Sequence, residues 1–176
     1  MRSVFLSLGS NQGDRCSLLV EATKRIDNLI GEVKLFSAIF ESEPWGFSAE
    51  VNFYNLALLV ETGLTPRQVL SKCLEIEKKL GRVREGTVNS SRLIDIDMLF
   101  FDEMLIDDND LVIPHPRLHL RKFVLEPLVM IAPDFIHPVI NKSIAELLHE
   151  TEDNSLITMI LPKYEFGKFL KNVNLK

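Results

Sequence analysis

Apolar runs of strand length alternate along this chain with stretches of helical apolar spacing, and no other property of the sequence narrows the possible folds as far. The runs cover 3–8, 33–40, 53–60 and 94–101. Apolar residues recur at the spacing of one helix face after the first run and again after the third. This order, strand-helix-strand-strand-helix-strand, predicts a ferredoxin-like βαββαβ core of the α/β (α+β) class, an antiparallel sheet with helices packed on it.

The ends of the two helices are marked in the sequence. Asp14 is placed to cap the first helix, and Gly31 lies where a left-handed residue commonly follows a helix. Thr65, Pro66 and Gln68 form the capping box and first-turn proline of the second. The apolar stripes are Leu18, Ala22, Ile26 and Leu29 in the first helix and Val69, Cys73, Ile76 and Leu80 in the second, which Gly81 ends.

The C-terminal part of the chain carries weaker signals. A small hairpin is expected within 105–112, an apolar helix at about 123–131, and a terminal helix within 163–176, where apolar residues again have roughly helical spacing. We expect one domain over 1–162 and a C-terminal extension over 163–176 that packs on it as a helix.

Composition limits the classes of protein to consider. The chain has 176 residues and a net charge of −5, which indicates one domain and argues against broad nucleic-acid binding. The apolar start before Ser7 is too short for a secretory signal, and no run approaches the ~20 apolar residues of a membrane span. We therefore expect a cytoplasmic monomer without nucleic-acid or membrane partners, in which Cys16 and Cys73 are reduced thiols.

Two aspartates, Asp95 and Asp97, interrupt the apolar run at 94–101. Because side chains alternate along a strand, both carboxylates point to one face, with Cα atoms about 6.5–7 Å apart. Asp is unfavourable in strands, and neighbouring carboxylates repel when both are ionised. Mg²⁺ would offset these costs, since it takes one or two protein carboxylates and leaves other positions to phosphates and water. A solvated acidic face of an edge strand is the alternative. The residues expected on the other face, in a core, are Ile94, Ile96, Met98 and Phe100.

Basic residues lie on both sides of this pair in sequence. They are Arg82, Arg84 and Arg92 before it, and His115, Arg117, His119, Arg121 and Lys122 after it. Guanidinium groups clamp phosphate oxygens bidentately, so together with metal-holding carboxylates they make up a phosphoryl-transfer site. No G-x-x-x-x-G-K-[ST] sequence occurs, so arginines would have to hold the phosphates. Each arginine taken singly also fits a solvated surface position.

Five segments in order carry a resemblance to a known family. They are Gly9-Ser10-Asn11, Phe53-Tyr54-Asn55, Gly81-Arg82-Val83-Arg84, Arg92-Leu93-Ile94-Asp95-Ile96-Asp97, and Ile113-Pro114-His115-Pro116-Arg117-Leu118-His119-Leu120-Arg121-Lys122-Phe123-Val124-Leu125. From about residue 4 to about residue 148 the chain resembles the 6-hydroxymethyl-7,8-dihydropterin pyrophosphokinases. The pattern R-x-I-D-I-D followed by P-H-P-R-x-H-x-R-x-F is the specific part.

The resemblance implies a three-layer α/β/α fold and transfer of pyrophosphate from ATP to the hydroxymethyl group of the pterin, with release of AMP, in folate synthesis. It implies that Asp95 and Asp97 hold two Mg²⁺ ions. The implied catalytic residues are Arg82, Arg92, Asp95 and Asp97. Those implied to bind ATP are Glu77, Arg82, Arg92, Met98, His115 and Arg121. Those implied to bind the pterin are Ser42, Glu43, Trp45, Phe53, Asn55 and Phe123.

The implied pterin residues also make physical sense, because two aromatic faces and an amide suit a flat polar heterocycle. Taken alone, Phe53 and Phe123 each fit a core position. The chain departs from the family pattern at 87–92, which lacks the usual Trp and Pro of a loop expected to close over ATP. Leu120 and Phe53 replace a common Glu and a frequent Tyr.

The expected reaction is in-line attack of the pterin hydroxymethyl oxygen on the β-phosphorus of ATP, in which the protein supplies positioning and electrostatics. A metal-dependent phosphohydrolase would use the same aspartates on water. A non-catalytic ligand-binding module is the third possibility, since ferredoxin-like folds host many functions.

Overall fold

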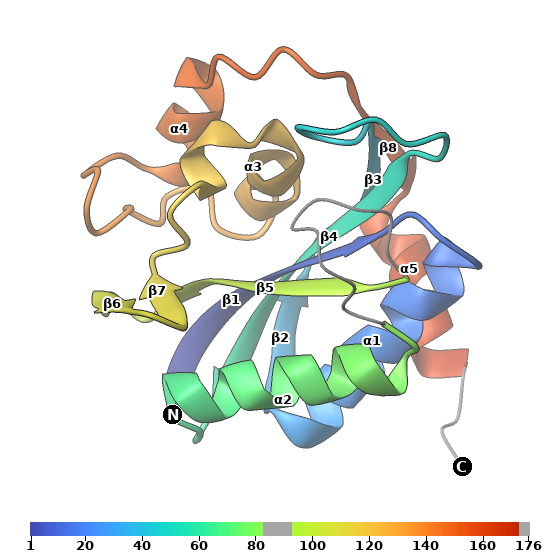
Figure 1. Ribbon diagram of the computed structural model, residues 1–176, viewed down its shortest axis with the longest axis horizontal. Helices are drawn as coiled ribbons and strands as arrows, with labels where there is room; N and C mark the ends of the chain where they lie inside the picture. The colour runs from blue at the N-terminus through green and yellow to red at the C-terminus, as the bar shows by residue number, and fades with distance from the viewer. Residues whose placement is uncertain (83–92, 173–176) are drawn as a thin grey trace.

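The computed structural model describes residues 1–82 and 93–172, and Figure 1 shows their arrangement. The elements in chain order are β1 (Arg2–Ser10), α1 (Arg15–Leu29), β2 (Glu32–Phe36), β3 (Ile39–Ser42), β4 (Phe53–Thr62), α2 (Pro66–Lys79), β5 (Asp95–Phe101), β6 (Ile106–Asp108), β7 (Leu111–Ile113), the 3₁₀ turn η1 (Leu118–Leu120), α3 (Lys122–Val129), α4 (Ile144–Glu150), β8 (Ile157–Leu161) and α5 (Lys163–Asn172).

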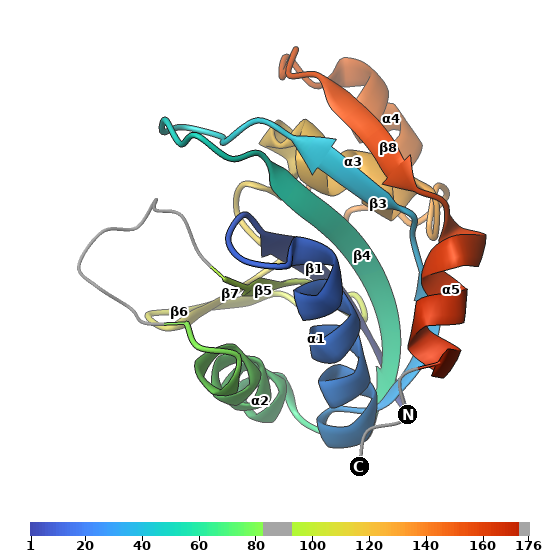
Figure 2. The same cartoon turned by 90° about the vertical axis from the view of Figure 1, so that its right-hand side faces the viewer.

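One antiparallel sheet forms the middle layer of the molecule. Its strands have the order β5-β1-β4-β3-β8, and β2 pairs with β4 beside β3. The helices α1 and α2 cover one face, and α3 and α4 cover the other, as Figures 1 and 2 show. The predicted ferredoxin-like order and the three α/β/α layers are confirmed.

The sheet separates two hydrophobic cores because β1 sends alternate side chains to opposite faces. Val4, Leu6 and Leu8 belong to the core under α1 and α2, whereas Phe5 belongs to the core under α3 and α4. The helix ends follow the sequence signals. Asp14 accepts a hydrogen bond from the Ser17 amide at the start of α1, and α2 begins with the complete Thr65–Gln68 capping box.

The expected single strand at 33–40 is wrong, since two strands, β2 and β3, occupy this stretch. At the break, Ser37 donates its amide hydrogen to the Ala57 carbonyl, 2.9 Å away. Its hydroxyl also accepts the Ala57 amide at 3.0 Å. A side-chain oxygen thus takes the place of a backbone acceptor, and the regular ladder is interrupted.

Among the glycines of the described residues, a positive φ occurs at Gly13, Gly46 and Gly81. Gly31 therefore does not have the expected left-handed conformation. It is required for a different reason. A Cβ atom at Gly31 would lie 2.1 Å from the carbonyl oxygen of Glu61 in β4. The end of α1 therefore approaches the sheet more closely than any side chain allows.

Phe100 faces the opposite core from the one expected. The pairing of β1 with β5 shifts between Phe5 and Leu6, which leaves Leu99 as an extra residue on β5. Such a bulge reverses the alternation beyond it. Ile94, Ile96 and Met98 therefore pack under α1 and α2, whereas Phe100 packs under α3 and α4.

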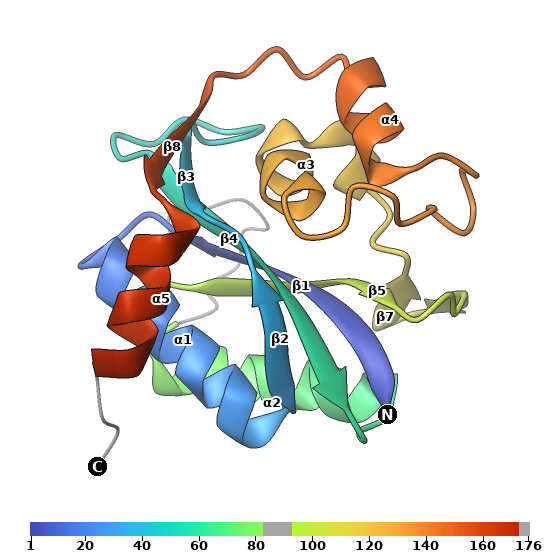
Figure 3. The same cartoon turned by 180° about the vertical axis from the view of Figure 1, so that it is seen from behind.

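Two further elements, β8 and α4, are not among those predicted from the sequence. In α5 the side chain of Phe166 is fully buried, and its ring lies 5.6 Å from that of Phe36, so this helix packs beside α1 and β2 (Figure 3). None of the helices in residues 1–82 and 93–172 combines the length and apolar character that crossing a bilayer requires.

Candidate active site

Asp95 and Asp97 lie on one face of β5, as the alternation predicts. Their neighbour Ile96 points into the core under α1 and α2, so both carboxylates face the α3 side of the sheet. The side chain of Asp95 is 21% exposed and that of Asp97 is 41% exposed, so a ligand in solution can reach both. On the neighbouring strand β1, Asp95 pairs with Gly9, which has no side chain, and Asp97 pairs with Ser7, whose side chain is small.

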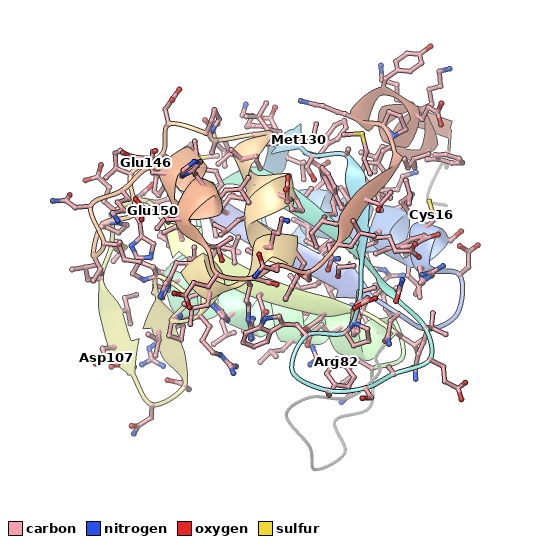
Figure 4. The ribbon with its side chains drawn as sticks, turned by 90° about the horizontal axis from the view of Figure 1, so that it is seen from above. Cys16, Arg82, Asp107, Met130, Glu146 and Glu150 are labelled. Atoms are coloured by element: carbon pink, nitrogen blue, oxygen red, sulfur yellow. The ribbon has the colours of Figure 1, made fainter. Side chains whose placement is uncertain are left out.

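Arg82, which follows α2, forms an ion pair with each of two carboxylates. One Nη1 atom donates to Asp95 Oδ1 at 2.5 Å and to Oε1 of Glu77. The same Glu77 oxygen accepts the backbone amide of Ile96 at 2.8 Å, although the Glu77 side chain is almost fully buried. The buried glutamate therefore joins α2 to β5 and holds Arg82 beside Asp95. Figure 4 labels Arg82 and shows it well apart from the hairpin residue Asp107.

Arg121 approaches the second aspartate from the α3 side. Its Nη1 lies 3.9 Å from Asp97 Oδ2, and the residue is only 8% exposed. Its guanidinium carbon lies 4.8 Å from the ring centre of Trp45 and 5.7 Å from that of Phe123, the range of cation–π contacts. Two arginines thus reach the two aspartates, Arg82 from the end of α2 and Arg121 from the start of α3.

His115 is joined to β5 by its backbone and is close enough to Arg121 and Asp95 to feel their charges. Its Nδ1 accepts the Arg117 amide at 3.2 Å, and its own amide donates to the Leu99 carbonyl at 2.9 Å. Burial, followed by the charges of Arg121 and Arg117, lowers the pKa of His115 from 6.5 to about 4. The ring is therefore neutral at physiological pH and carries its proton on Nε2, where it can donate to an anionic oxygen.

A polar group at the start of β4 completes the other end of the site. Asn55 is buried and donates from Nδ2 to the Ser42 hydroxyl at 2.9 Å. Its Oδ1 lies against Gly9, at 3.6 Å from where a Cβ would be. Phe53, two residues earlier, is partly exposed and contacts the ring of Phe47. This end can therefore offer an amide and an aromatic face to a flat ligand.

Trp45 also lines a cavity of ≈ 590 Å³. His119 and residues 150–153 line the same cavity. Neither the aspartates of β5 nor Asn55 is among the residues that line this cavity.

Some expected site residues are placed differently or lie outside the described part. Arg84 and Arg92, with the stretch that departs from the family pattern, fall in residues 83–92, outside the described residues. Met98 is 6% exposed in the core under α1 and α2, so any role in binding ATP belongs to its backbone. Glu43 is exposed in the loop after β3.

One contributor to the site was missed in the sequence. Arg15, the first residue of α1, donates to the Asn52 carbonyl at 2.8 Å and lies over the ring of Tyr54 at 3.6 Å. It therefore holds the chain entering β4. Nothing in the local sequence distinguishes Arg15 from a solvated helix residue.

The metal-binding capacity of the site is limited to two carboxylates. In residues 1–82 and 93–172 no group of three or more His, Cys, Asp or Glu side chains could hold a metal ion. A structural zinc or calcium site needs more protein ligands than this. Two carboxylates on an accessible face do fit Mg²⁺, whose remaining positions are filled by phosphates and water.

Comparison with known families gives a clear match. Residues 5–133 match the family model described as 7,8-dihydro-6-hydroxymethylpterin-pyrophosphokinase (HPPK). A 2-amino-4-hydroxy-6-hydroxymethyldihydropteridine pyrophosphokinase of Aquifex aeolicus is 38% identical over 150 residues, which are 85% of this chain and 92% of that protein. The protein of the same name from Methylorubrum extorquens is 41% identical over 137 residues, 77% of this chain and 86% of the relative.

Some similar proteins are much longer than this chain. The folic acid synthesis protein fol1 of Pneumocystis carinii is 38% identical over 91% of this chain, but the match spans only 21% of that protein. The solved wild-type HPPK-DHPS of Plasmodium falciparum superposes with a TM-score of 0.69 at 17% identity, covering 85% of this chain and 44% of that one. At this identity the structural match supports the fold alone.

Proposed function

This chain belongs to the 7,8-dihydro-6-hydroxymethylpterin-pyrophosphokinase family, and from that premise we propose that the β5 face bearing Asp95 and Asp97 is its active site. The chain is an ATP-dependent diphosphokinase of folate biosynthesis. It transfers pyrophosphate from ATP to the hydroxymethyl group of 6-hydroxymethyl-7,8-dihydropterin and gives AMP and the pterin diphosphate.

One observation carries the assignment of the site. Two partly exposed carboxylates on one strand face are approached by Arg82 from α2 and by Arg121 from the start of α3. A triphosphate bound with Mg²⁺ presents both negative oxygens and cations, so it needs both kinds of group within one site. A solvated acidic face would not require a buried arginine beside it.

Asp95 and Asp97 would hold Mg²⁺, which would neutralise charge on the phosphates of ATP. Arg82, Arg121 and His115 would bind the phosphate oxygens, and Arg92 is expected to join them. His115 acts as a neutral donor through Nε2, because its Nδ1 already accepts the Arg117 amide. Glu77 fixes Arg82.

The pterin would bind at the end of the site formed by Asn55, Phe53 and Phe123, with Trp45 and the backbone of 42–45 beside it. Asn55 offers an amide, which matches the donor and acceptor edge of a pterin. The Ser42 hydroxyl, which accepts from Asn55 Nδ2, fixes the orientation of that amide.

In the proposed step, the hydroxymethyl oxygen of the pterin attacks the β-phosphorus of ATP in line. A new O–P bond forms as the hydroxyl proton is released to water. The bond from the β-phosphorus to the oxygen shared with the α-phosphate breaks, and AMP leaves with that oxygen. Arg82 and Arg121 remain fixed while negative charge shifts toward the leaving oxygen. Catalysis by this chain is therefore mainly positioning and electrostatic stabilisation.

Product identification tests this proposal. The protein is incubated with Mg²⁺, ATP and 6-hydroxymethyl-7,8-dihydropterin, and both products are identified by mass. AMP together with pterin diphosphate is expected. ADP or inorganic phosphate would instead indicate a phosphohydrolase, and binding without any product would indicate a ligand-binding module. The cytoplasmic location, the monomeric state and the division at residue 162 stay predictions.

A further inference from the structure

The helix α3 begins directly after Arg121, and its start is held from a distant part of the chain. The residue before the helix usually caps it with its own side chain, but Arg121 makes no such hydrogen bond. Asp153 supplies the acceptor instead: its Oδ2 accepts the amide of Lys122, the first residue of α3, at 2.9 Å. The two residues are 31 positions apart in sequence, so only the tertiary fold brings them together.

The carboxylate of Asp153 is itself fixed. Its second oxygen accepts the amide of Ser155 at 3.0 Å, and its own amide donates to the Thr151 hydroxyl at 3.3 Å. Burial acts to raise the pKa of Asp153, but the hydrogen bonds from Ser155 and Lys122 outweigh it and lower the pKa. The group is therefore ionised at neutral pH, and an anion at a helix N-terminus is favoured by the helix dipole.

The position of the Lys122 amide determines where the Arg121 side chain begins. Arg121 has extended backbone angles, φ −124° and ψ 101°, and its carbonyl accepts the amides of Val124 and Leu125 in the first turn of α3. From this backbone the guanidinium reaches Trp45 and Asp97 while it remains 8% exposed. A shift at the start of α3 would move the arginine relative to the aspartate.

We propose that Asp153 is a positioning residue for pyrophosphate transfer, which holds Arg121 at the phosphate-binding face by capping α3. The inference rests on the proposed role of Arg121 in binding ATP. Asp153 lies beyond the residues matched by the family model, which end at 133. Asp153 also lines the same cavity as Trp45, the residue whose ring contacts the Arg121 guanidinium.

The test compares two substitutions at this position. Asp153→Ala removes the acceptor, whereas Asp153→Asn keeps an oxygen that can accept the Lys122 amide. In Asp153→Ala we expect the lost free energy of the helix cap to appear as weaker ATP binding. The KM for ATP should then rise about fivefold to tenfold. For Asp153→Asn we expect a KM for ATP within about twofold of the wild-type value, since most of a cap's effect lies in the hydrogen bond.

A matched control is Glu152→Ala, which removes the neighbouring exposed carboxylate and should leave the KM for ATP unchanged. All variants are assayed at a temperature at which circular dichroism shows them folded, because partial unfolding lowers the apparent kcat but not the KM. Hydrogen exchange adds a direct reading: the Lys122 amide should exchange faster in Asp153→Ala than in the wild type, and Asp153→Asn should restore its protection.

A double-mutant cycle with Arg121→Ala separates the two proposals. If Asp153 acts through Arg121, Asp153→Ala should add little to the KM for ATP once Arg121 has been removed. An unchanged KM in Asp153→Ala, or an equal rise in Asp153→Asn, would overturn the positioning role while leaving the proposed function intact. An Arg121→Ala variant with a wild-type KM and kcat would overturn both the role of Arg121 and this inference.

Discussion

Arg82 and Asp95 form an ion pair in which the Nη1 of the arginine lies 2.5 Å from Oδ1 of the aspartate. The same nitrogen also meets Glu77, which is almost fully buried. Burial acts to lower the pKa of Arg82, but the negative charges of Asp95 and Glu77 and the hydrogen bonds to them raise it, so the guanidinium stays charged. Arg82 therefore connects the buried Glu77 of α2 to Asp95, the accessible carboxylate of β5 that is expected to bind metal.

Removing the charge of either candidate metal ligand should abolish most of the activity. For Asp95→Asn and Asp97→Asn we expect kcat to fall by roughly 10²–10³, the effect typical of losing one electrostatic contribution to a transition state. Calorimetry with Mg²⁺ and a non-hydrolysable ATP analogue should show weakened binding. Asp107→Asn, in the exposed β6–β7 hairpin, is the matched control and should behave as wild type (Figure 4). Wild-type turnover in both site variants would disprove the metal site.

Glu77 should matter for stability as well as for catalysis. Glu77→Ala leaves Arg82 and the Ile96 amide without this buried acceptor, so we expect unfolding to cost about 3 kcal/mol less. Urea denaturation measures the difference. Glu75→Ala on the same helix removes a partly exposed glutamate paired with Lys72 and Lys79, and it should change the unfolding midpoint far less. Equal losses in the two variants would contradict the buried role of Glu77.

Two glycines provide a test of close packing at the end of α1. Gly31→Ala places a Cβ 2.1 Å from the Glu61 carbonyl oxygen, so we expect it to lower stability by about 3 kcal/mol or more. At Gly63 nothing lies within 4 Å of the added atom, and Gly63→Ala should stay within about 0.5 kcal/mol of wild type. Thermal unfolding of the two purified variants compares them. A Gly31→Ala protein as stable as Gly63→Ala would show that the two segments are further apart.

The neutral state of His115 predicts how stability depends on pH. The folded pKa of about 4 lies below the ordinary value of 6.5, so the unfolded chain binds more protons between these values. Stability is therefore full above pH 6.5, falls as the pH is lowered toward 4, and levels off below that for this group. The loss should be between about 1 and 3 kcal/mol, since solvent near the ring reduces the effect.

The contribution of His115 is isolated by comparing wild type with His115→Gln in denaturant at several pH values, without ATP or Mg²⁺. The glutamine variant should lose less stability between pH 6.5 and 4. His149→Gln, an exposed histidine on α4, controls for the removal of any histidine. Parallel stability curves for wild type and His115→Gln would show that the ring is not held neutral.

Much of the core fold follows from local pattern. The period of the apolar residues indicates which segments are strands and which are helices, and local capping explains why α1 begins after Asp14 and why α2 begins with a capping box. The side-chain alternation of β5 likewise placed Asp95 and Asp97 on one face without reference to any other strand. These features depend on residues within one or two turns of each other, so the sequence contains their full cause.

Other features depend on which segments meet, and a linear pattern does not contain that information. The bulge at Leu99 turns Phe100 to the other core only because β1 and β5 pair in a particular register. Gly31 is needed because Glu61 of β4 passes close to it, and the break at Ser37 arises where its hydroxyl meets Ala57.

The candidate active site likewise has some features set by the local sequence and others set by the tertiary structure. The sequence by itself determined the residue types, the two carboxylates of β5 and the arginines and histidines that precede and follow them. Only the tertiary structure brought Arg121 within 3.9 Å of Asp97 and placed Asp153 at the start of α3. The physical reason is that electrostatic attraction and hydrogen bonding act over a few ångströms in space, whatever the separation along the chain.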